Sequence, residues 1–391
     1  MRFRSFTAGP PAPLPFGTVA VRIRTIDSSR RRCDHRWLRG SAFAAFSRQA
    51  QMVIMEEFRH ERLSCLAVCA GAGGLALGLE QAGFDPVLLL DNRPVACETL
   101  RLNRPDWNVL ESDLLDFVPE EHRECYDVDL LAAGLPRVKA SAAVRREDSD
   151  EELRLLEATV MLVHGVQPRA LLIENVSELA SKPAYEPIRA VVEAELEHLG
   201  YEYAWFVVNA MWHGVPQDRK QGILVALKGD SMRDFVPPPR DTDPPPTVGE
   251  ALGASMAARG WPHAAAWAAQ ADQVAPTLVG GSWNRGGPDL GPTGSKRSWA
   301  RMRVNGGTVA TDVPGPDDRW DPSPDGADLV KLTVEQAARL QGFPDDWSFA
   351  GGKTVRYRQV GHASPPPVAR AFGLAIRAAL GRRGPAPRDR Q

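Results

Sequence analysis

The chain has 391 residues, a length that fits one large domain with a smaller one attached. An apolar fraction of 43% can fill a globular core, whereas no apolar run reaches the ~18 residues that a membrane span needs. The formal net charge of -2 gives no sign of a nucleic-acid binder, although it leaves room for a local basic cleft.

Cysteine usage and composition indicate where the protein works. The five cysteines have neither metal-ligand spacing nor a disulfide framework, which predicts buried free thiols and no metal site. Free thiols fit a reducing cytosol. Arginine greatly outnumbers lysine, and Ala, Gly and Pro are abundant, as is typical of GC-rich bacterial genomes. We therefore expect a cytoplasmic bacterial protein.

Residues 1–60 are predicted to form a basic N-terminal extension without regular structure. Residues 1–50 carry ten arginines, no lysine and two acids. Such a stretch is either an arm that contacts DNA phosphates or a disordered extension, including one produced by a start codon ahead of Met52 or Met55. The composition does not decide between these, and no function is assigned to it.

From Leu63 onward, short apolar runs alternate with helical patterns. Strands are predicted at 63–68, 85–91, 107–113, 128–134, 168–176, 201–210 and 222–229, and helices at 75–84, 94–104, 152–166 and 185–200. Strands that alternate with helices indicate a parallel sheet with helices on both faces. We predict an α/β fold with a doubly wound, Rossmann-like sheet over residues 61–230.

Residues 231–330 break this pattern. A proline-rich connector leads into a glycine-rich stretch with isolated tryptophans, which predicts a smaller, loop-rich domain. A helix over 332–343 follows, opened by Thr333 as its N-cap with Gln336 three positions on. With a terminal helix over 365–380, residues 331–383 are expected to return to the large domain, and residues 384–391 to form a tail.

Three predicted strand ends carry groups suited to a nucleoside ligand. Gly71, Gly73 and Gly74 occupy the first strand-to-helix turn, where the backbone can approach a ligand. Asp91 ends the second strand, where a ribose diol would lie, and Asp113 ends the third, where an adenine amino group would lie. A glycine cluster alone is equally typical of a tight structural turn. The position of the two carboxylates favours an adenosine-type cofactor.

Several segments then resemble, in unbroken order, the motifs of the DNA cytosine-5 methyltransferases. They are CAGAGGLALGLEQAGF at 69–84, ENV at 174–176, VPQDRKQGILVAL at 215–227, LTVEQAARLQGFPDDW at 332–347 and RYRQVGHASPPPVARAFG at 356–373. The stretch at 280–300 falls where this family keeps its target recognition domain. The resemblance implies a methyltransferase fold that binds S-adenosylmethionine and double-stranded DNA.

The resemblance also assigns residues. It implies a cofactor site made of Cys69, Ala70, Gly71, Gly73, Gly74, Asp91, Asn92, Asp113, Leu114, Pro136, His362 and Ser364. It makes Glu174 the catalytic acid, with Gln217 and Arg219 helping to position the base and Glu174, although the segment alone is typical of a polar turn. The basic run Lys296, Arg297, Arg301 and Arg303 is expected to contact DNA, although a solvated face explains such runs as often. Two family residues are replaced, the last arginine of Gln-x-Arg-x-Arg by Gln221 and an asparagine by His362.

The most consequential departure is at the nucleophile. In AAGLPRVKASAA, aligning Pro136 and Ser141 with the family motif places Arg137 at the cysteine position. The family adds a thiolate to C6 of cytosine so that C5 can attack the methyl sulfonium. Arginine remains protonated and cannot perform this addition. Cys69 is a weak second choice of nucleophile, and Ser141 has no evident base beside it.

These observations lead to three hypotheses. The leading one is a degenerate homologue that binds S-adenosylmethionine and perhaps duplex DNA, inactive alone and associated with the nucleoid as a regulatory or partner subunit. The acids over 145–153, near the expected DNA, further disfavour catalysis. The second is an active enzyme, which either receives the missing motif from a partner methyltransferase or nuclease subunit or methylates another nucleophile. The third is an interaction scaffold that has lost both ligands.

Overall fold

The computed structural model describes residues 62–139, 151–281, 283, 286–321, 323 and 326–381. The expectations for residues 1–60, for Ser141 and the acidic stretch up to residue 150, and for the tail at 384–391 lie outside these residues. Among the described residues, no helix is both long and apolar enough to cross a lipid bilayer.

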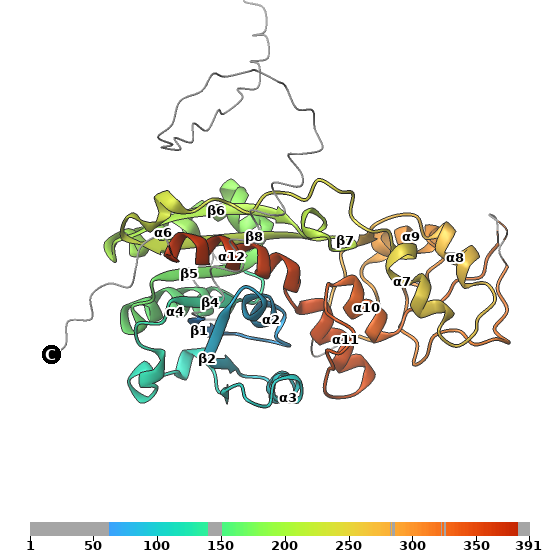
Figure 1. Ribbon diagram of the computed structural model, residues 1–391, viewed down its shortest axis with the longest axis horizontal. Coiled ribbons are helices and arrows are strands. Elements are labelled where there is room, and N and C mark those ends of the chain that lie inside the picture. Colours follow the sequence, from blue (N-terminus) through green and yellow to red (C-terminus); the bar gives the residue numbers. More distant parts are fainter. Residues whose placement is uncertain are drawn as a thin grey trace, which may run out of the picture. The chain divides into compact units, whose positions relative to one another are not determined.

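A seven-stranded sheet forms the centre of the larger part of the molecule (Figure 1). In sheet order its strands are β3 (Val109–Glu111), β2 (Phe84–Asp91), β1 (Leu63–Val68), β4 (Leu130–Gly134), β5 (Ala170–Val176), β8 (Lys220–Lys228) and β6 (Tyr201–Asn209). The order reverses between β1 and β4, where a doubly wound sheet forms its ligand crevice. All seven predicted strands are confirmed, with β3 shorter than expected.

One strand corrects the prediction of a parallel sheet. β8 runs antiparallel to both of its neighbours, β5 and β6. The chain joins β6 to β8 through residues 210–219, which hold a short turn and the two-residue strand β7 (Gln217–Asp218). A parallel pair needs a crossover of a dozen or more residues, usually a helix, so this short connection turns the chain back on itself.

Helices cover both faces of the sheet, as predicted. One face packs against α4 (Glu151–Val166), α5 (Ser177–Ser181) and α6 (Glu186–His198). The other packs against α2 (Gly74–Gln81) and the terminal helix α12 (Pro366–Gly381). Helix α3 (Pro94–Asn103) adds Leu100 to a small cluster with residues of β1, β2 and α2. This arrangement buries the strands and leaves their carboxyl ends as the place for a ligand.

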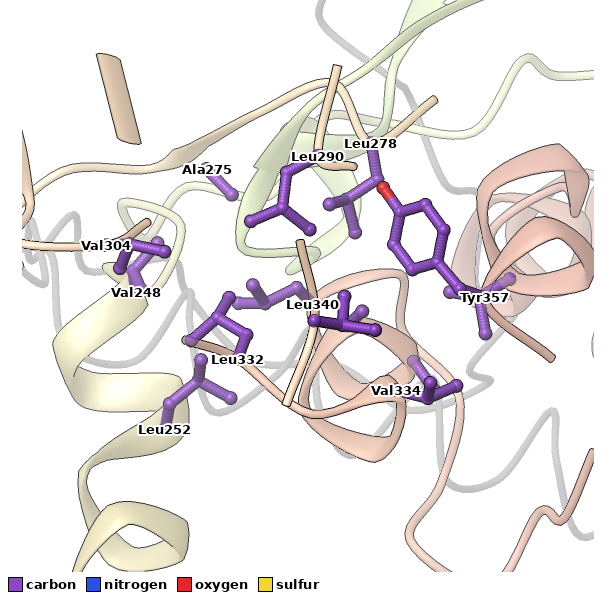
Figure 2. Packing of buried hydrophobic residues seen from close by; sticks show 14 of the residues in the cluster. Val248, Leu252, Ala275, Leu278, Leu290, Val304, Leu332, Val334, Leu340 and Tyr357 are labelled. Atoms are coloured by element: carbon purple, nitrogen blue, oxygen red, sulfur yellow. The ribbon is translucent and has the colours of Figure 1, made fainter. Parts of the chain in front are cut away.

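The rest of the described chain packs around a second apolar core. It contains α7 (Val248–Ala257), α8 (Ala264–Gln270), β9 (Ala275–Pro276), α9 (Thr293–Arg301), α10 (Val334–Leu340) and α11 (Lys353–His362). Figure 2 shows Leu252 and Leu290, which belong to residues 231–330 (the recognition-like region), packed with Leu340 of α10 and Tyr357 of α11. β9 also pairs with β7. The recognition-like region therefore shares its core with segments expected to belong to the large domain.

Candidate cofactor and catalytic site

A cavity of about 770 Å³ opens at the carboxyl ends of the central strands. Its size is within the ~300–1,000 Å³ of small-molecule sites. Among the residues expected at the site, those that line the cavity are Cys69, Ala70, Gly71, Gly74, Asp91, Asn92, Asp113, Leu114, Pro136, Arg137, Glu174, Arg219, His362 and Ser364. The structure thus brings together residues that are up to about three hundred positions apart. Gly73, Gln217 and the basic run at 296–303 are not in this lining.

The glycine turn explains why two of its residues have different roles. Gly71 has φ 53°, and nothing lies within 4 Å of the position that a Cβ atom would take. Gly73 has φ 87°, and a Cβ there would meet the side chains of Leu100 and Trp347 at 2.8 Å. Both backbone conformations favour glycine. Gly71 leaves open space at the cavity wall, whereas Gly73 permits close packing behind the turn.

The two predicted carboxylates lie at the cavity and also hold its walls. Asp91 accepts hydrogen bonds from the backbone N–H groups of Gly71 (2.8 Å) and Arg93 (2.9 Å). Burial raises the pKa of Asp91, and these two bonds oppose the rise. Asp113 accepts from Leu115 N at 2.9 Å and from Asn92 Nδ2 at 3.1 Å. Each carboxylate keeps acceptor capacity for a ligand hydroxyl or amino group.

Glu174 and Arg137 line the same cavity from β5 and from the segment after β4. Gln221 Nε2 donates to Glu174 Oε1 at 2.8 Å and to Ser364 Oγ at 3.0 Å. Burial raises the pKa of Glu174, while the charges of Arg219 and Arg137 and the bond from Gln221 act in the opposite direction. Arg137 itself is exposed. Its guanidinium is therefore a solvent-facing cation whose charge lowers the pKa of Glu174.

The side chains of the Gln-x-Arg pair connect segments that are distant in the chain. Gln217 is fully buried and donates to Leu340 O and Gln341 Oε1, and its own oxygen accepts from Leu278 N. Arg219 Nη1 donates to Leu278 O at 2.9 Å and to Gly361 O at 3.2 Å. Both side chains join β7 and the start of β8 to the second core. Arg219 still faces the cavity, and burial lowers its pKa to about 10, so it stays charged at neutral pH.

Thiols in the described part of the chain are protonated at neutral pH. Burial is the largest cause of a raised pKa for Cys69, to about 12, with further increases from Asp91 and Asp113. Burial likewise raises the pKa of Cys125 to about 12 and that of Cys97 to about 11, and it raises the pKa of Cys65. A thiolate at Cys69 is therefore disfavoured although the residue lines the cavity.

His362 lies in an aromatic stack that the sequence did not reveal. Its ring stacks on Trp283 at a centroid distance of 5.3 Å, and Arg93 lies 4.4 Å from the centroid of Trp283. His362 Nδ1 donates to Arg358 O at 2.8 Å. Burial is the main cause that lowers the pKa of His362 to about 4; the bond to Arg358 O opposes this shift, and the charges of nearby arginines add to it. No local pattern signals Trp283 or Arg93, because their contacts join distant segments.

The basic run divides into two kinds of residue. Arg297 and Arg301 are exposed on α9, and Lys296 pairs with Asp289 at 3.1 Å. Arg303 is buried, donates to Gly326 O and Asp321 O, and lies over the ring of Trp320. The expectation that Arg303 contacts DNA is therefore corrected, because its guanidinium is used inside the fold.

Comparisons with known proteins agree with this geometry. The model of the C-5 cytosine-specific DNA methylase family matches residues 63–378. The chain belongs to this family. Type II methyltransferase M.NaeI from Lentzea aerocolonigenes is 43% identical over 325 residues, which cover 83% of this chain and 77% of that protein. Type II methyltransferase M.NgoMIV from Neisseria gonorrhoeae is 40% identical over 328 residues, 82% of this chain and 98% of that protein.

Solved structures show the same fold. A putative DNA modification methyltransferase encoded within an E. coli prophage has a TM-score of 0.56 at 20% identity and covers 82% of this chain and 100% of its own. A DNMT2 mutant from Spodoptera frugiperda has a TM-score of 0.55 at 14% identity and covers 80% of this chain and 99% of its own. At these identities the two structures show the shared α/β fold.

Members of the C-5 cytosine methylase family use S-adenosylmethionine as their methyl donor. The residues at this cavity fit such a group, because open space lies at Gly71 and two strand-end carboxylates face the same cavity. S-adenosylmethionine would supply an electrophilic methyl group on a sulfonium. The glycine turn, Asp91 and Asp113 would hold its adenosine end.

Proposed function

We propose that this protein is a cytosine-5 methyltransferase homologue that binds S-adenosylmethionine and duplex DNA but does not methylate cytosine by itself. One observation carries the proposal: Arg137, which the motif alignment puts at the position of the nucleophilic cysteine, lines the same cavity as Glu174 and its charge acts on that acid. The cofactor half rests on the cavity and its strand-end carboxylates. The DNA half rests on family membership and on the exposed arginines of α9.

The chemistry explains why this position is decisive. C5 of cytosine is too electron-poor to attack a methyl sulfonium until a nucleophile has added at C6. A protonated acid such as Glu174 assists at N3 but does not form that bond. A guanidinium offers only N–H donors and remains protonated in proteins, so Arg137 cannot add to the ring. It can instead donate hydrogen bonds to a base or a phosphate.

Cys69 does not restore the missing step. Its thiol has a pKa of about 12, whereas attack requires the thiolate. Burial is the main reason for this high pKa, and the charges of Asp91 and Asp113 raise it further. The two carboxylates proposed to hold the cofactor therefore also disfavour a sulfur anion at Cys69.

Two measurements on one preparation test the proposal. Isothermal titration of the full chain with S-adenosylmethionine is expected to show binding, and duplex DNA is expected to gain no tritium from labelled cofactor. Arg137→Cys in the same assay is expected to gain DNA methylation if the remaining machinery is intact. Incorporation of label into cytosine by the wild-type protein would contradict the inactive assignment, and absence of cofactor binding would contradict the other half.

A further inference from the structure

Trp347 lies behind the glycine turn and outside the cavity lining. It belongs to the segment between α10 and α11, far along the chain from the turn, and its side chain is 5% exposed. Its indole Nε1 donates to Ala72 O at 3.1 Å. The six-membered part of the ring packs where a Cβ atom of Gly73 would be. One side chain thus contacts both residues at the middle of the turn.

This contact fixes the orientation of one peptide group. The carbonyl of Ala72 is held by Trp347, and the N–H of Gly73, which belongs to the same peptide plane, donates to Ala70 O at 3.0 Å. A peptide unit is planar, so two bonds at its opposite ends leave it little freedom to rotate. Ala72 lines the cavity from this plane. Trp347 therefore fixes the orientation of a peptide group in the cavity wall although it does not line the cavity itself.

A second contact holds the indole in place. The guanidinium of Arg104 lies 5.4 Å from the centroid of Trp347 and 5.7 Å from that of Trp107. Arg104 also forms a two-pronged ion pair with Glu80 on α2, with N–O distances of 2.8 Å. Helix α2 starts at the glycine turn. Arg104 therefore connects this helix, through Glu80, to Trp347, which contacts the turn.

We propose that Trp347 is a positioning residue for the cofactor: it pre-organises the Ala72–Gly73 peptide so that the turn is ready to receive the adenosine end of S-adenosylmethionine. The inference rests on the cofactor binding proposed above and adds a residue that does not touch the ligand. A wall that is already ordered before binding costs less conformational entropy when the ligand arrives. Removal of the indole N–H should therefore weaken binding more than it weakens the fold.

The test compares two tryptophans in equivalent settings. Trp347→Phe keeps an aromatic ring but loses the bond to Ala72 O. Trp320→Phe is the matched control, because Trp320 is also 5% exposed and its Nε1 donates to a backbone carbonyl, Asp328 O, at 3.2 Å. The ring of Trp320 lies against Trp261, His263 and the guanidinium of Arg303. Isothermal titration with S-adenosylmethionine and thermal unfolding without ligand are measured on both full-length variants.

Trp347→Phe is expected to bind S-adenosylmethionine roughly fivefold more weakly than wild type, the factor that corresponds to one ordinary hydrogen bond. Trp320→Phe is expected to melt at a similarly lowered temperature with wild-type affinity. If Trp347→Phe is too unstable to purify, Arg104→Gln replaces it, because Arg104 is partly exposed and its loss also frees the indole. That variant is expected to bind about threefold more weakly.

Three outcomes would overturn the inference, and they are distinguishable. Wild-type affinity in Trp347→Phe, or in Arg104→Gln where that is used, removes this role and leaves the proposed function standing. Equal loss of affinity in Trp320→Phe shows a general effect of stability. Absence of binding by the wild-type protein removes the cofactor proposal together with this one.

Discussion

At the scale of single residues, the cavity brings the buried acid Glu174 together with the cation Arg137, which we propose to occupy the nucleophile position. Burial raises the pKa of Glu174, although Arg219 and Arg137 oppose this. The replacement of a motif arginine by Gln221 contributes, because the 2.8 Å bond from Gln221 Nε2 is a neutral one. A full positive charge at that place would favour the carboxylate more strongly. The departure at Gln221 therefore keeps Glu174 nearer to its acid form.

The raised pKa of Glu174 predicts a pH dependence of stability. The pKa of Glu174 is higher in the folded state than in the unfolded state. At pH values between these two pKa values the folded state therefore binds more protons, and the free energy of unfolding falls as pH rises through the folded-state pKa. Glu174→Gln removes this dependence while keeping an acceptor for Gln221. Urea unfolding at a series of pH values upward from the ordinary glutamate pKa of 4.5 should show the variant gaining stability over wild type as pH rises. A constant difference across this range would contradict it.

At the scale of secondary-structure elements, α2 and α12 are joined unusually closely. A Cβ atom at Gly78 would lie 2.3 Å from Pro366 O, 2.5 Å from Ala369 Cβ and 2.8 Å from Arg370 N. Two of these atoms are backbone, so the neighbours cannot yield by a rotamer change. Glycine in a helix normally costs stability relative to alanine. Here the close approach of the two helices reverses that preference.

Gly78→Ala is therefore expected to lower the free energy of unfolding by about 1–3 kcal/mol, because it overpacks the contact between α2 and α12. The matched control is Gly294→Ala in α9, where nothing lies within 4 Å of the added Cβ. That change should leave stability unaltered or raise it by up to about 1 kcal/mol. Chemical unfolding of both variants measures this, and equal effects at the two positions would refute the packing account.

Element-scale prediction from sequence succeeded where the signal was local. The helix after Thr333 has the expected capping box with Gln336. Thr247 and Glu250 form the same capping box at the start of α7, a helix within the region predicted to be loop-rich. The direction of β8 was missed because alternation of elements does not report strand direction. A short connection without a helix was the available clue.

At the scale of the whole molecule, cofactor-side residues were predictable because chain order places strand ends at one edge of the sheet. Asp91 and Asp113 follow directly from this rule. Contacts between distant segments were not predictable: Gln217 and Arg219 join the two cores, and Trp347 reaches the glycine turn. A motif match identifies such residues but does not predict which atoms they contact.

The two kinds of basic residue predict different effects on DNA binding. Arg297→Ala and Arg301→Ala should each weaken binding to duplex DNA and reduce its salt dependence by about one unit of slope, since both side chains are exposed. Arg303→Ala should instead lower thermal stability, because Gly326 O and Asp321 O would lose their donor. Fluorescence anisotropy at several salt concentrations measures the slopes. Unchanged slopes in both exposed variants would place the DNA contact elsewhere.

The central claim concerns bond formation at C6 of the target base. The most direct measurement is covalent trapping on duplex oligonucleotides that contain 5-fluorocytosine, with S-adenosylmethionine present and denaturing electrophoresis as the readout. The wild-type protein is expected to give no adduct, and Arg137→Cys is expected to give one. A covalent complex formed by the wild-type chain would contradict the account, because it would show that another group in this cavity performs the addition.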